Sequence, residues 1–221
     1  MNIRIRLSMA VLILAALACS SLSAGTNQVI GSGHVISETR DVANFTSVEL
    51  ASSADVNILL GNAESVNVEA DDNIARLIQT KVTNGKLIIS TQPNVNFTST
   101  NRVVVTLAMK SLERVTLSGS GNLHVAEMTG PDLVVELPGS GDITVEGTTD
   151  HVSISLAGSG NIQCNGLKAK SAQVTLTGSG TIMVYASESL DARLAGSGTI
   201  RYEGSPAQVT KSITGSGTIV P

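Results

Sequence analysis

The tripeptide Gly-Ser-Gly recurs along this 221-residue chain at a nearly constant spacing. From the second copy onward, successive copies start 20, 19, 20, 18 and 19 residues apart. A short motif repeated at such a period indicates stacked structural units, each in contact with its neighbours. Because glycine adopts conformations that strain other residues, we expect the triplets to form a corner that recurs in every unit. The predicted structural corners contain Gly31, Gly33, Gly119, Gly121, Gly139, Gly141, Gly158, Gly160, Gly178, Gly180, Gly196, Gly198, Gly215 and Gly217.

Aliphatic residues alternate with polar residues on both sides of each corner. The residue two before the triplet is Leu117, Leu137, Leu156, Leu176, Leu194 or Ile213, and the second residue after it is Leu123, Ile143, Ile162, Ile182, Ile200 or Ile219. This period of two predicts short strands with one face inward. Coils of about 19 residues without a helical period predict an all-β protein, a parallel β-helix.

The composition agrees with a core of stacked aliphatic columns. Hydrophobic residues make up 42% of the chain, but aromatic residues make up only 2%. A narrow coil filled by like-on-like aliphatic ladders has little room for rings, which bury large areas. Cys164 falls in an inward column, so we expect a buried small hydrophobe and not a reactive thiol.

The N-terminal half carries a degenerate form of the repeat. The segment 48–58 matches the template position by position, with Ser and Ala in place of the glycines, so coils are expected from about residue 42. Between this segment and the regular array we predict a short helical turn within 71–78 and a hairpin of 79–82 with 87–90 around Asn84-Gly85. This stretch is expected to cap or broaden the first coils, because an uncovered β-helix end is an open edge.

The first residues have the pattern of an export signal. Arg4 and Arg6 precede an apolar stretch over 7–18, which is too short to span a bilayer. We expect a signal peptide at 1–18, with cleavage as late as residue 24 in one alternative, then a tether at 19–29 and the β-helix domain at 30–221. Cys19 directly follows the small residue Ala18, which leaves two alternatives: a lipid attachment at Cys19, or plain cleavage.

Charge and residue types exclude several kinds of partner. Removal of 1–18 leaves 12 basic against 18 acidic side chains, which gives no support for docking on nucleic acid or anionic lipid. Contact with a membrane is therefore expected only through a lipid on Cys19. Of the residues that follow the regular corners, only Asp142 is acidic, so no structural calcium is predicted. His34, His124 and His151 lack metal-ligand spacing, and we expect no metal and no cofactor.

Parallel β-helices also carry polysaccharide lyases and hydrolases, which need converging carboxylates or a carboxylate with a base. Glu136 and Arg193 share an outward column, but three coils, or about 14 Å, separate them. Glu146 and Glu203 are also three coils apart. Glu127, Asp132 and Asp150 fall between coils and are interpreted as solvated charges. We therefore predict no catalytic residues, and Tyr185 is the outward ring best placed for a sugar.

The segments Phe45–Leu50 and Val66–Asp71, together with the repeated Gly-Ser-Gly-Asn/Asp-Ile pattern, resemble a bacterial family described as putative auto-transporter adhesin, head GIN domain. The resemblance covers roughly 30–220. It implies a right-handed β-helix on an exported or lipid-anchored envelope protein, located in the periplasm, on the outer membrane or at the cell surface. The expected function is a non-catalytic, adhesin-like binding scaffold for a protein or glycan ligand. The alternatives are a self-associating structural protein of the envelope and a polysaccharide-active enzyme.

Overall fold

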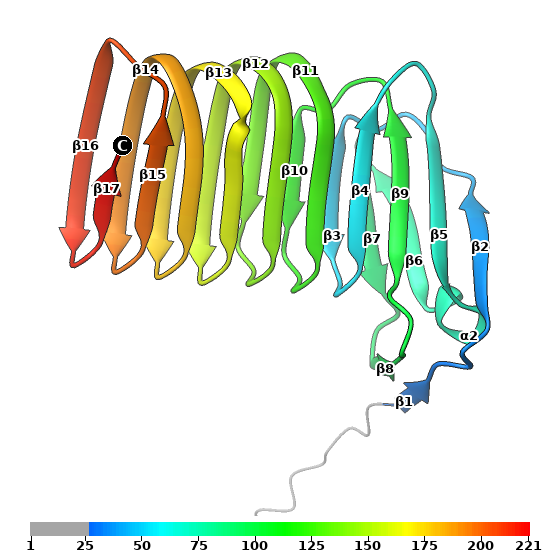
Figure 1. Cartoon of the computed structure of the whole chain (residues 1–221). Helices are drawn as coiled ribbons and strands as arrows, with labels where there is room; N and C mark the ends of the chain where they lie inside the picture. Colours follow the sequence, from blue (N-terminus) through cyan, green and yellow to red (C-terminus); the bar gives the residue numbers. More distant parts are fainter. Residues whose placement is uncertain (1–26) are drawn as a thin grey trace, which may run out of the picture.

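The computed structural model describes residues 27–221, and these form a flattened β-solenoid with one very short helix (Figure 1). The expected signal peptide, Cys19 and most of the expected tether lie outside the described residues. In Figure 1 the coils stack from the blue and cyan N-terminal strands at the right to the red C-terminal strands at the left. The parallel β-helix predicted from the repeat is confirmed.

Seventeen strands and one helix make up the described chain. The N-terminal elements are β1 (Asn27–Ile30), β2 (Val35–Arg40), β3 (Ser47–Ala51), β4 (Asp55–Leu60), β5 (Ser65–Asp71), α2 (Asp72–Ala75), β6 (Ile78–Thr83), β7 (Lys86–Thr91), β8 (Val95–Thr98) and β9 (Val104–Met109). The regular coils contain β10 (Arg114–Leu117), β11 (Asn122–Leu137), β12 (Asp142–Gly158), β13 (Asn161–Gly178), β14 (Thr181–Gly196), β15 (Thr199–Glu203), β16 (Gln208–Gly215) and β17 (Thr218–Val220).

Each regular coil pairs in parallel with the next, at the spacing of the sequence repeat. Val135 is aligned with Val115 on one side and with Ile154 on the other, so one coil takes 20 or 19 residues. The long strands β11 to β14 bend midway, so each coil has a segment that follows its corner and a segment that precedes the next corner. We call the surface made by the following segments the first face, and the surface made by the preceding segments the second face.

The interior lies between the two faces and consists of aliphatic columns. Leu117, Leu137, Leu156 and Leu176 are stacked in one column, and each is completely buried. Burial of a leucine side chain stabilises the fold by about 1.5 to 3 kcal/mol, and these contacts repeat in every coil. Cys164 is completely buried in a column of the first face, and burial raises the pKa of its thiol to about 12. The expectation that Cys164 is a core residue is confirmed.

The Gly-Ser-Gly triplets of the regular coils lie in the turns along the lower edge in Figure 1. Each turn bonds to the turn before it: Ser197 N and Thr199 N donate to the carbonyl oxygens of Gly178 and Gly180, both at 3.0 Å. A Cβ at Gly198 would lie on that Gly180 oxygen and close to a leucine methyl group of the preceding coil. Stacking therefore requires glycine here, because the carbonyl of the preceding coil occupies the place of the side chain.

The first corner contains Ser52 and Ala54 at the positions aligned with Gly119 and Gly121. Its flanking strands β3 and β4 pair in register with β10 and β11, so the degenerate repeat predicted over 48–58 is confirmed. A Cβ on Gly121 would overlap the carbonyl oxygen of Ala54, whereas Ala54 itself follows no earlier triplet turn. Side chains are tolerated in the first corner because it begins the stack.

Antiparallel strands terminate the stack at its N-terminal end. Strand β5 lies between β2 and β9 and is antiparallel to both. The predicted hairpin is confirmed as β6 and β7, joined by Asn84 and Gly85 with positive φ angles of 51° and 73°. The predicted helical turn is α2. Strand β1 pairs with β8 below the solenoid, and it includes the last residues of the expected tether.

The last coil has a neighbour on one side only. Every residue of β16 is exposed, including Val209 and Ile213, which continue inward columns. Lys211 also occupies an inward position. Its Nζ lies 3.4 Å from the carbonyl oxygen of Ile219 and 4.6 Å from the centre of the Tyr202 ring. A charged side chain thus lies across the end of the core.

Within residues 27–221, no helix has the length and apolar character that are needed to cross a lipid bilayer.

Candidate functional site: a furrow along the second face

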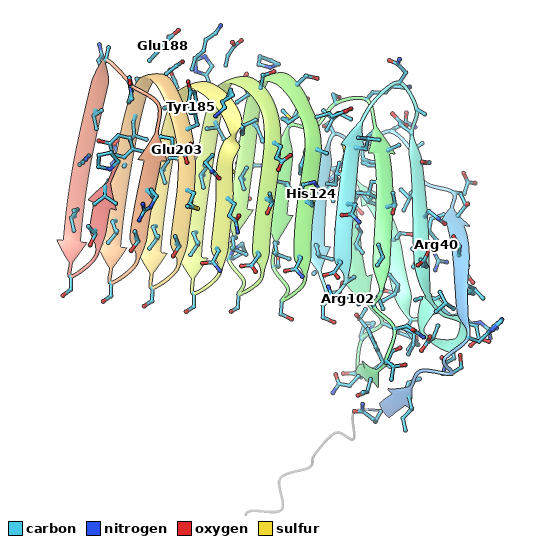
Figure 2. All side chains as sticks on the ribbon, viewed as in Figure 1. Arg40, Arg102, His124, Tyr185, Glu188 and Glu203 are labelled. Atoms are coloured by element: carbon cyan, nitrogen blue, oxygen red, sulfur yellow. The ribbon has the colours of Figure 1, made fainter. Side chains whose placement is uncertain are left out.

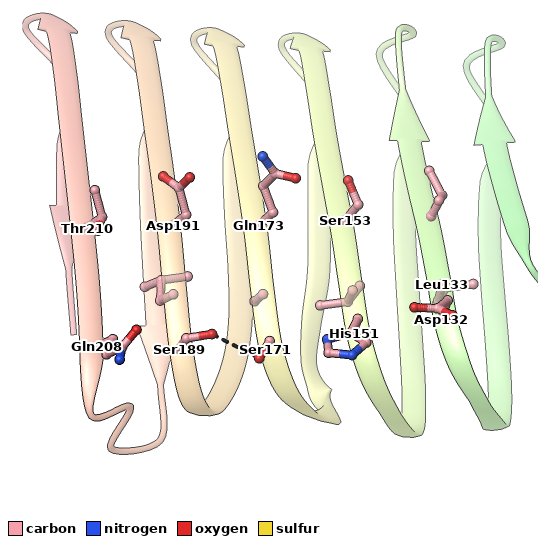
Figure 3. Close-up of a pocket in the computed structure, with 14 residues that line it drawn as sticks. Asp132, Leu133, His151, Ser153, Ser171, Gln173, Ser189, Asp191, Gln208 and Thr210 are labelled. Atoms are coloured by element: carbon pink, nitrogen blue, oxygen red, sulfur yellow. Dashed lines mark hydrogen bonds between the residues drawn. The ribbon is translucent and has the colours of Figure 1, made fainter.

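Two rows of outward side chains border a furrow along the second face (Figure 3). The residues of the first row are aligned from coil to coil and are Asp132, His151, Ser171, Ser189 and Gln208. The second row lies two residues further along each strand and consists of Ser47, Arg114, Val134, Ser153, Gln173, Asp191 and Thr210. Because side chains of a strand alternate between faces, both rows point away from the core.

The furrow is hollow because the side chains at its centre are small. Ser171 and Ser189 have adjacent hydroxyl groups, with 2.9 Å between their oxygens, and Ala172 lies between the rows. These residues, with their neighbours in the two rows, line a hollow of about 470 Å³. In Figure 3 the two rows lie at two heights along the same strands, with Ser171 and Ser189 in the middle of the lower row.

A second hollow of about 440 Å³ continues the furrow toward the N-terminal coils. It shares Asp132 and Val134 with the first hollow and extends to Arg114 and Ser47. The second row therefore crosses six coil-to-coil steps from Ser47 to Thr210. At about 4.8 Å for each step, the furrow is about 29 Å long.

The charged groups of the furrow are mostly engaged in ion pairs or hydrogen bonds. Asp191 Oδ2 accepts a bond from Arg193 at 2.6 Å, and Arg114 donates to Glu136 at 2.7 Å. The other carboxylate oxygen of Asp191, Oδ1, is buried and has no hydrogen-bond partner among residues 27–221. A buried acceptor is normally satisfied, and within the described part of the chain this oxygen is an exception.

Three consecutive positions of the first row hold Asp132, His151 and Ser171. Aspartate, histidine and serine are also the residues of the catalytic triads of many hydrolases. A working triad needs a hydrogen bond from nucleophile to base and another from base to carboxylate. In the described structure the hydroxyl of Ser171 bonds to Ser189 instead. Among the described residues, no hydrogen bond joins Ser171 to His151 or His151 to Asp132, although Ser171 and Ser189 show that side chains of neighbouring coils can bond. The row therefore presents these groups side by side to a ligand.

The outward columns singled out from the sequence do not converge on a common site. Glu136 accepts bonds from Arg114 and Thr116, whereas Arg193 bonds Asp191, so the acid and the base have different partners. Glu203 accepts a bond from the amide of Asn165 at 3.2 Å. Glu127 has a positive φ of 56° at the bend of β11.

Asp150 lies at the arch between the faces and forms an ion pair with Lys170 at 2.6 Å. The hydrogen bond and charge of Lys170 hold the pKa of Asp150 below its ordinary value, and Asp150 in turn raises the pKa of Lys170. His34 and His151 are exposed, and His124 is half-buried on the first face. Among residues 27–221, no group of three or more His, Cys, Asp and Glu side chains is placed to hold a metal ion.

Tyr185 lies on the first face, as Figure 2 shows together with Glu203 and His124. The Nζ of Lys168 is 4.0 Å from the centre of its ring. A cation at this distance is attracted to the ring face, so Lys168 covers one side of the platform that a sugar could use. Tyr185 is therefore not part of the furrow, and one face of its ring is occupied by its own chain.

The polar residues that follow the corners bond to one another across coils. The side-chain amide of Asn122 donates to Asp55 at 2.7 Å, and that of Asn161 donates to Asp142 at 2.8 Å. Arg102 bonds the second oxygen of Asp55 at 2.8 Å. The amides of the turns bond the carbonyl oxygens of the preceding coil, which leaves these side chains to pair among themselves.

Gly31 and Gly33 have surroundings unlike those of the other triplets, because they lie between β1 and β2. A Cβ at Gly31 would overlap the carboxylate of Asp71, and Gly33 has a positive φ of 79°. Asp71 is buried and accepts bonds from Ser99 at 2.6 Å and Asn101 at 2.7 Å. These bonds, with one from the Gly33 amide, lower the pKa of Asp71 despite its burial. This triplet packs against the N-terminal cap.

The sequence interpretation missed the furrow because it followed only one outward column of the second face, the one containing Thr116 and Glu136. The furrow rows lie two and four residues before that column. The signal was present in the same alternation, which extends to Gln173 and Ser171 in one coil and to Asp191 and Ser189 in the next. What alternation could not reveal is that small central side chains leave a hollow.

Several solved structures are similar to this chain along most of its length. A putative adhesin from Bacteroides fragilis NCTC 9343 has 25% identity and a TM-score of 0.75, and the match covers 87% of this chain and 99% of that chain. A putative lipid binding protein from Parabacteroides distasonis ATCC 8503 has 25% identity and a TM-score of 0.59, with 88% and 99% covered. A putative adhesin from Parabacteroides merdae ATCC 43184, at 20% identity and a TM-score of 0.58, shares the fold, with 88% and 98% covered.

Comparison with curated protein sequences finds no match. A family model described as putative auto-transporter adhesin, head GIN domain, matches residues 44–206, which include the first corner, most of the regular coils and most of the furrow. The chain therefore belongs to this adhesin-like family, as its repeat, its β-solenoid and its structural neighbours together indicate.

Proposed function

We propose that this chain is a non-catalytic binding domain of the bacterial cell envelope and that the furrow of the second face is its contact surface. The observation that carries the proposal is the furrow itself, a hollow about 29 Å long to which every regular coil contributes polar side chains. Family membership and neighbours named as adhesins support a role in binding.

The spacing of the furrow carboxylates favours binding over hydrolysis. Asp132 and Asp191 are separated by three coil steps, or about 14 Å. Paired carboxylates of glycoside hydrolases lie roughly 5 to 9.5 Å apart, so these two do not fit as acid and base on one bond. Glu113, which also lines the furrow, accepts a bond from the hydroxyl of Thr46 at 3.3 Å.

Site-directed cross-linking on whole cells tests the proposal. A photo-crosslinking residue at Ser171 lies in the furrow, and the same residue at exposed Gln163 lies on the first face of the same coil. We expect cross-linked envelope species from position 171 and far fewer from position 163. Equal yields from both positions would contradict a contact surface in the furrow.

Two further measurements address location and chemistry. Protease treatment of intact cells should degrade a surface-displayed protein, and a fully protected periplasmic protein would exclude an adhesin role. Turnover of an ester such as p-nitrophenyl butyrate should stay at the buffer rate. A faster rate that Ser171→Ala abolishes would instead assign hydrolysis to the row of Asp132, His151 and Ser171.

Export and anchoring extend the proposal to residues outside the described structure. We propose that residues 1–18 direct export and that a lipid on Cys19 holds the domain at a membrane. Cys19→Ala should then release the protein into the soluble fraction of lysed cells. If the variant fractionates like the wild type, the lipid anchor is contradicted, and the proposal that residues 1–18 direct export is unaffected.

A further inference from the structure

We propose that the ligand of the furrow is a linear, uncharged glycan that lies along the solenoid axis and contacts several coils at once. This inference rests on the proposed function, because it names the chemical class of ligand for the same surface. Three features of the furrow carry it: its repetition, the chemistry of its side chains, and its charge.

The furrow offers the same two positions again in each coil. Ser153 and His151 in one coil are followed by Gln173 and Ser171, and then by Asp191 and Ser189. A ligand that itself repeats can form similar contacts with each successive coil. Many weak contacts then add up along such a ligand. A compact ligand could not contact the furrow over its length of about 29 Å.

Hydroxyl and amide groups dominate the walls of the furrow. Serine and threonine hydroxyls both donate and accept, and the glutamines Gln173 and Gln208 supply two donors and an acceptor each. These groups match sugar hydroxyls, which also both donate and accept. The carboxylates of Asp132 and Asp191, which also line the furrow, are strong acceptors for sugar hydroxyls.

The floor of the furrow is strand backbone. The residues between the two rows, Val152, Ala172 and Leu190, turn their side chains into the core and are at most 5% exposed. A sugar ring that lies between the rows would place the hydroxyl groups of its rim against the polar side chains on both sides.

The charges of the furrow disfavour a polyanion. Arg114 is paired with Glu136, and Arg193 with Asp191, so both arginines near the furrow already have acidic partners. Asp132 would repel a phosphate or uronate group that lies beside it. Nucleic acid and acidic polysaccharides are therefore disfavoured as ligands.

The test uses the full mature chain and uncharged oligosaccharides of defined length. Malto-, cello- and chito-oligosaccharides of one to eight units are titrated by calorimetry, with polygalacturonate and oligolysine as charged probes. We expect one uncharged series to bind at least tenfold more tightly as a hexamer than as a dimer, because a longer chain contacts more coils. Charged probes that bind better than every uncharged series would overturn the proposal.

Ser171→Gln locates the binding, since a longer side chain at the centre fills the hollow. Ser155→Gln makes the same change in the neighbouring outward row, which does not line the furrow. We expect affinity to fall at least tenfold for Ser171→Gln and to change less than twofold for Ser155→Gln. Equal effects of the two substitutions, or no binding of any uncharged series, would overturn the proposal.

The cell cross-linking experiment separates this inference from the proposed function. Periodate cleaves the vicinal diols of 1,4-linked glucose units, so where malto- or cello-oligosaccharides bind, pretreatment of the cells should abolish the species cross-linked from position 171. The glycan would be excluded if the protein binds no oligosaccharide in calorimetry and the cross-links persist after periodate treatment. The furrow would then still be a contact surface, as the proposed function states. If untreated cells give no cross-linked species from position 171, the proposed function itself is contradicted.

Discussion

The two ends of the solenoid terminate the same stack of strands in different ways. At the N-terminal end, β2 and β5 run antiparallel to their neighbours, and β6 runs antiparallel to β7, which is itself parallel to β3. A buried carboxylate, Asp71, joins the cap to the loop at residues 99–101. At the C-terminal end, β16 is exposed throughout, and Lys211 lies across the end of the core. A regular repeat provides no terminating element of its own, because every coil exposes an unpaired strand edge on which another coil can stack.

The same contrast explains where glycine is required. Within the array, each corner lies against the carbonyl groups of the corner before it, and a Cβ would overlap them. At the start of the array, Ser52 and Ala54 carry side chains because no earlier triplet lies beneath them. The identity of a corner residue thus follows from its position in the stack.

The largest effect is expected from a methyl group at a central corner. A Cβ on Gly141 would overlap the carbonyl oxygen of Gly121, which is fixed by the backbone bonds between coils. We expect Gly141→Ala to lower the free energy of unfolding by more than about 4 kcal/mol or to prevent folding. Urea denaturation followed by circular dichroism measures the change.

Gly61→Ala is the matched control for this prediction, because no atom lies within 4 Å of the added Cβ. It should change stability by less than about 0.5 kcal/mol. At the first corner, Ala54→Gly should cost only about 1 kcal/mol, mainly through the greater freedom of the unfolded chain. A Gly141→Ala protein as stable as Gly61→Ala would contradict the stacking argument.

The second prediction compares two residues of one inward column, one in the middle of the stack and one in its last coil. Leu176 and Ile213 belong to the same column, but Leu176 is completely buried and Ile213 is 47% exposed in the last coil. Leu176→Ala should cost about 2 to 5 kcal/mol through lost burial and a cavity. Ile213→Ala should cost less than about 1 kcal/mol. Similar losses in the two variants would show that the last coil is covered in solution.

The third prediction concerns self-association through the open end. Lys211→Leu completes the apolar column at β16 and removes the charge that keeps another strand from pairing there. We expect its sedimentation coefficient to rise with protein concentration, whereas the wild type should sediment as a monomer. Lys110→Leu removes an equal charge far from this end and should behave like the wild type. Concentration-dependent association of the wild type would favour the structural, self-associating alternative.

The smallest effect is expected from acid at the N-terminal cap. Folding lowers the pKa of Asp71, so its charged form stabilises the cap at pH values above the ordinary carboxyl value of 3.8. This contribution is lost as the pH falls through the lowered pKa of the folded state. Hydrogen exchange in β2 and β5, corrected for intrinsic rates, should therefore accelerate in acid before exchange in β12 and β13 does. In Asp71→Asn the acid-dependent difference should disappear.

Local patterns were sufficient to predict the regular coils, the first degenerate coil and the Asn84-Gly85 hairpin. In each, the residue spacing specifies the backbone directly: alternation places side chains on two faces, and a two-residue Asn-Gly turn fixes the register of its strands. The antiparallel pairing of β5 with β2 and β9 could not be read in this way. Its residues alternate like those of any strand, and only contacts between distant segments select the direction.

The furrow lies between these two cases. Its residues are visible as outward positions in the sequence, because the repeat assigns every residue to a face. Its hollow depends on the size of Ser171, Ser189 and Ala172 relative to their neighbours in adjacent coils. Likewise, the spare oxygen of Asp191 appears only when Arg193 is seen to bond the other one.

The sequence by itself determined the solenoid, its period, its aliphatic core and the burial of Cys164, because a repeat imposes the same local geometry on every coil. Only the tertiary structure decided how the stack ends, why the first corner lacks glycine and where the surface is hollow. These properties depend on which groups are in contact across coils. The contacts are set by packing between segments that are distant in the sequence.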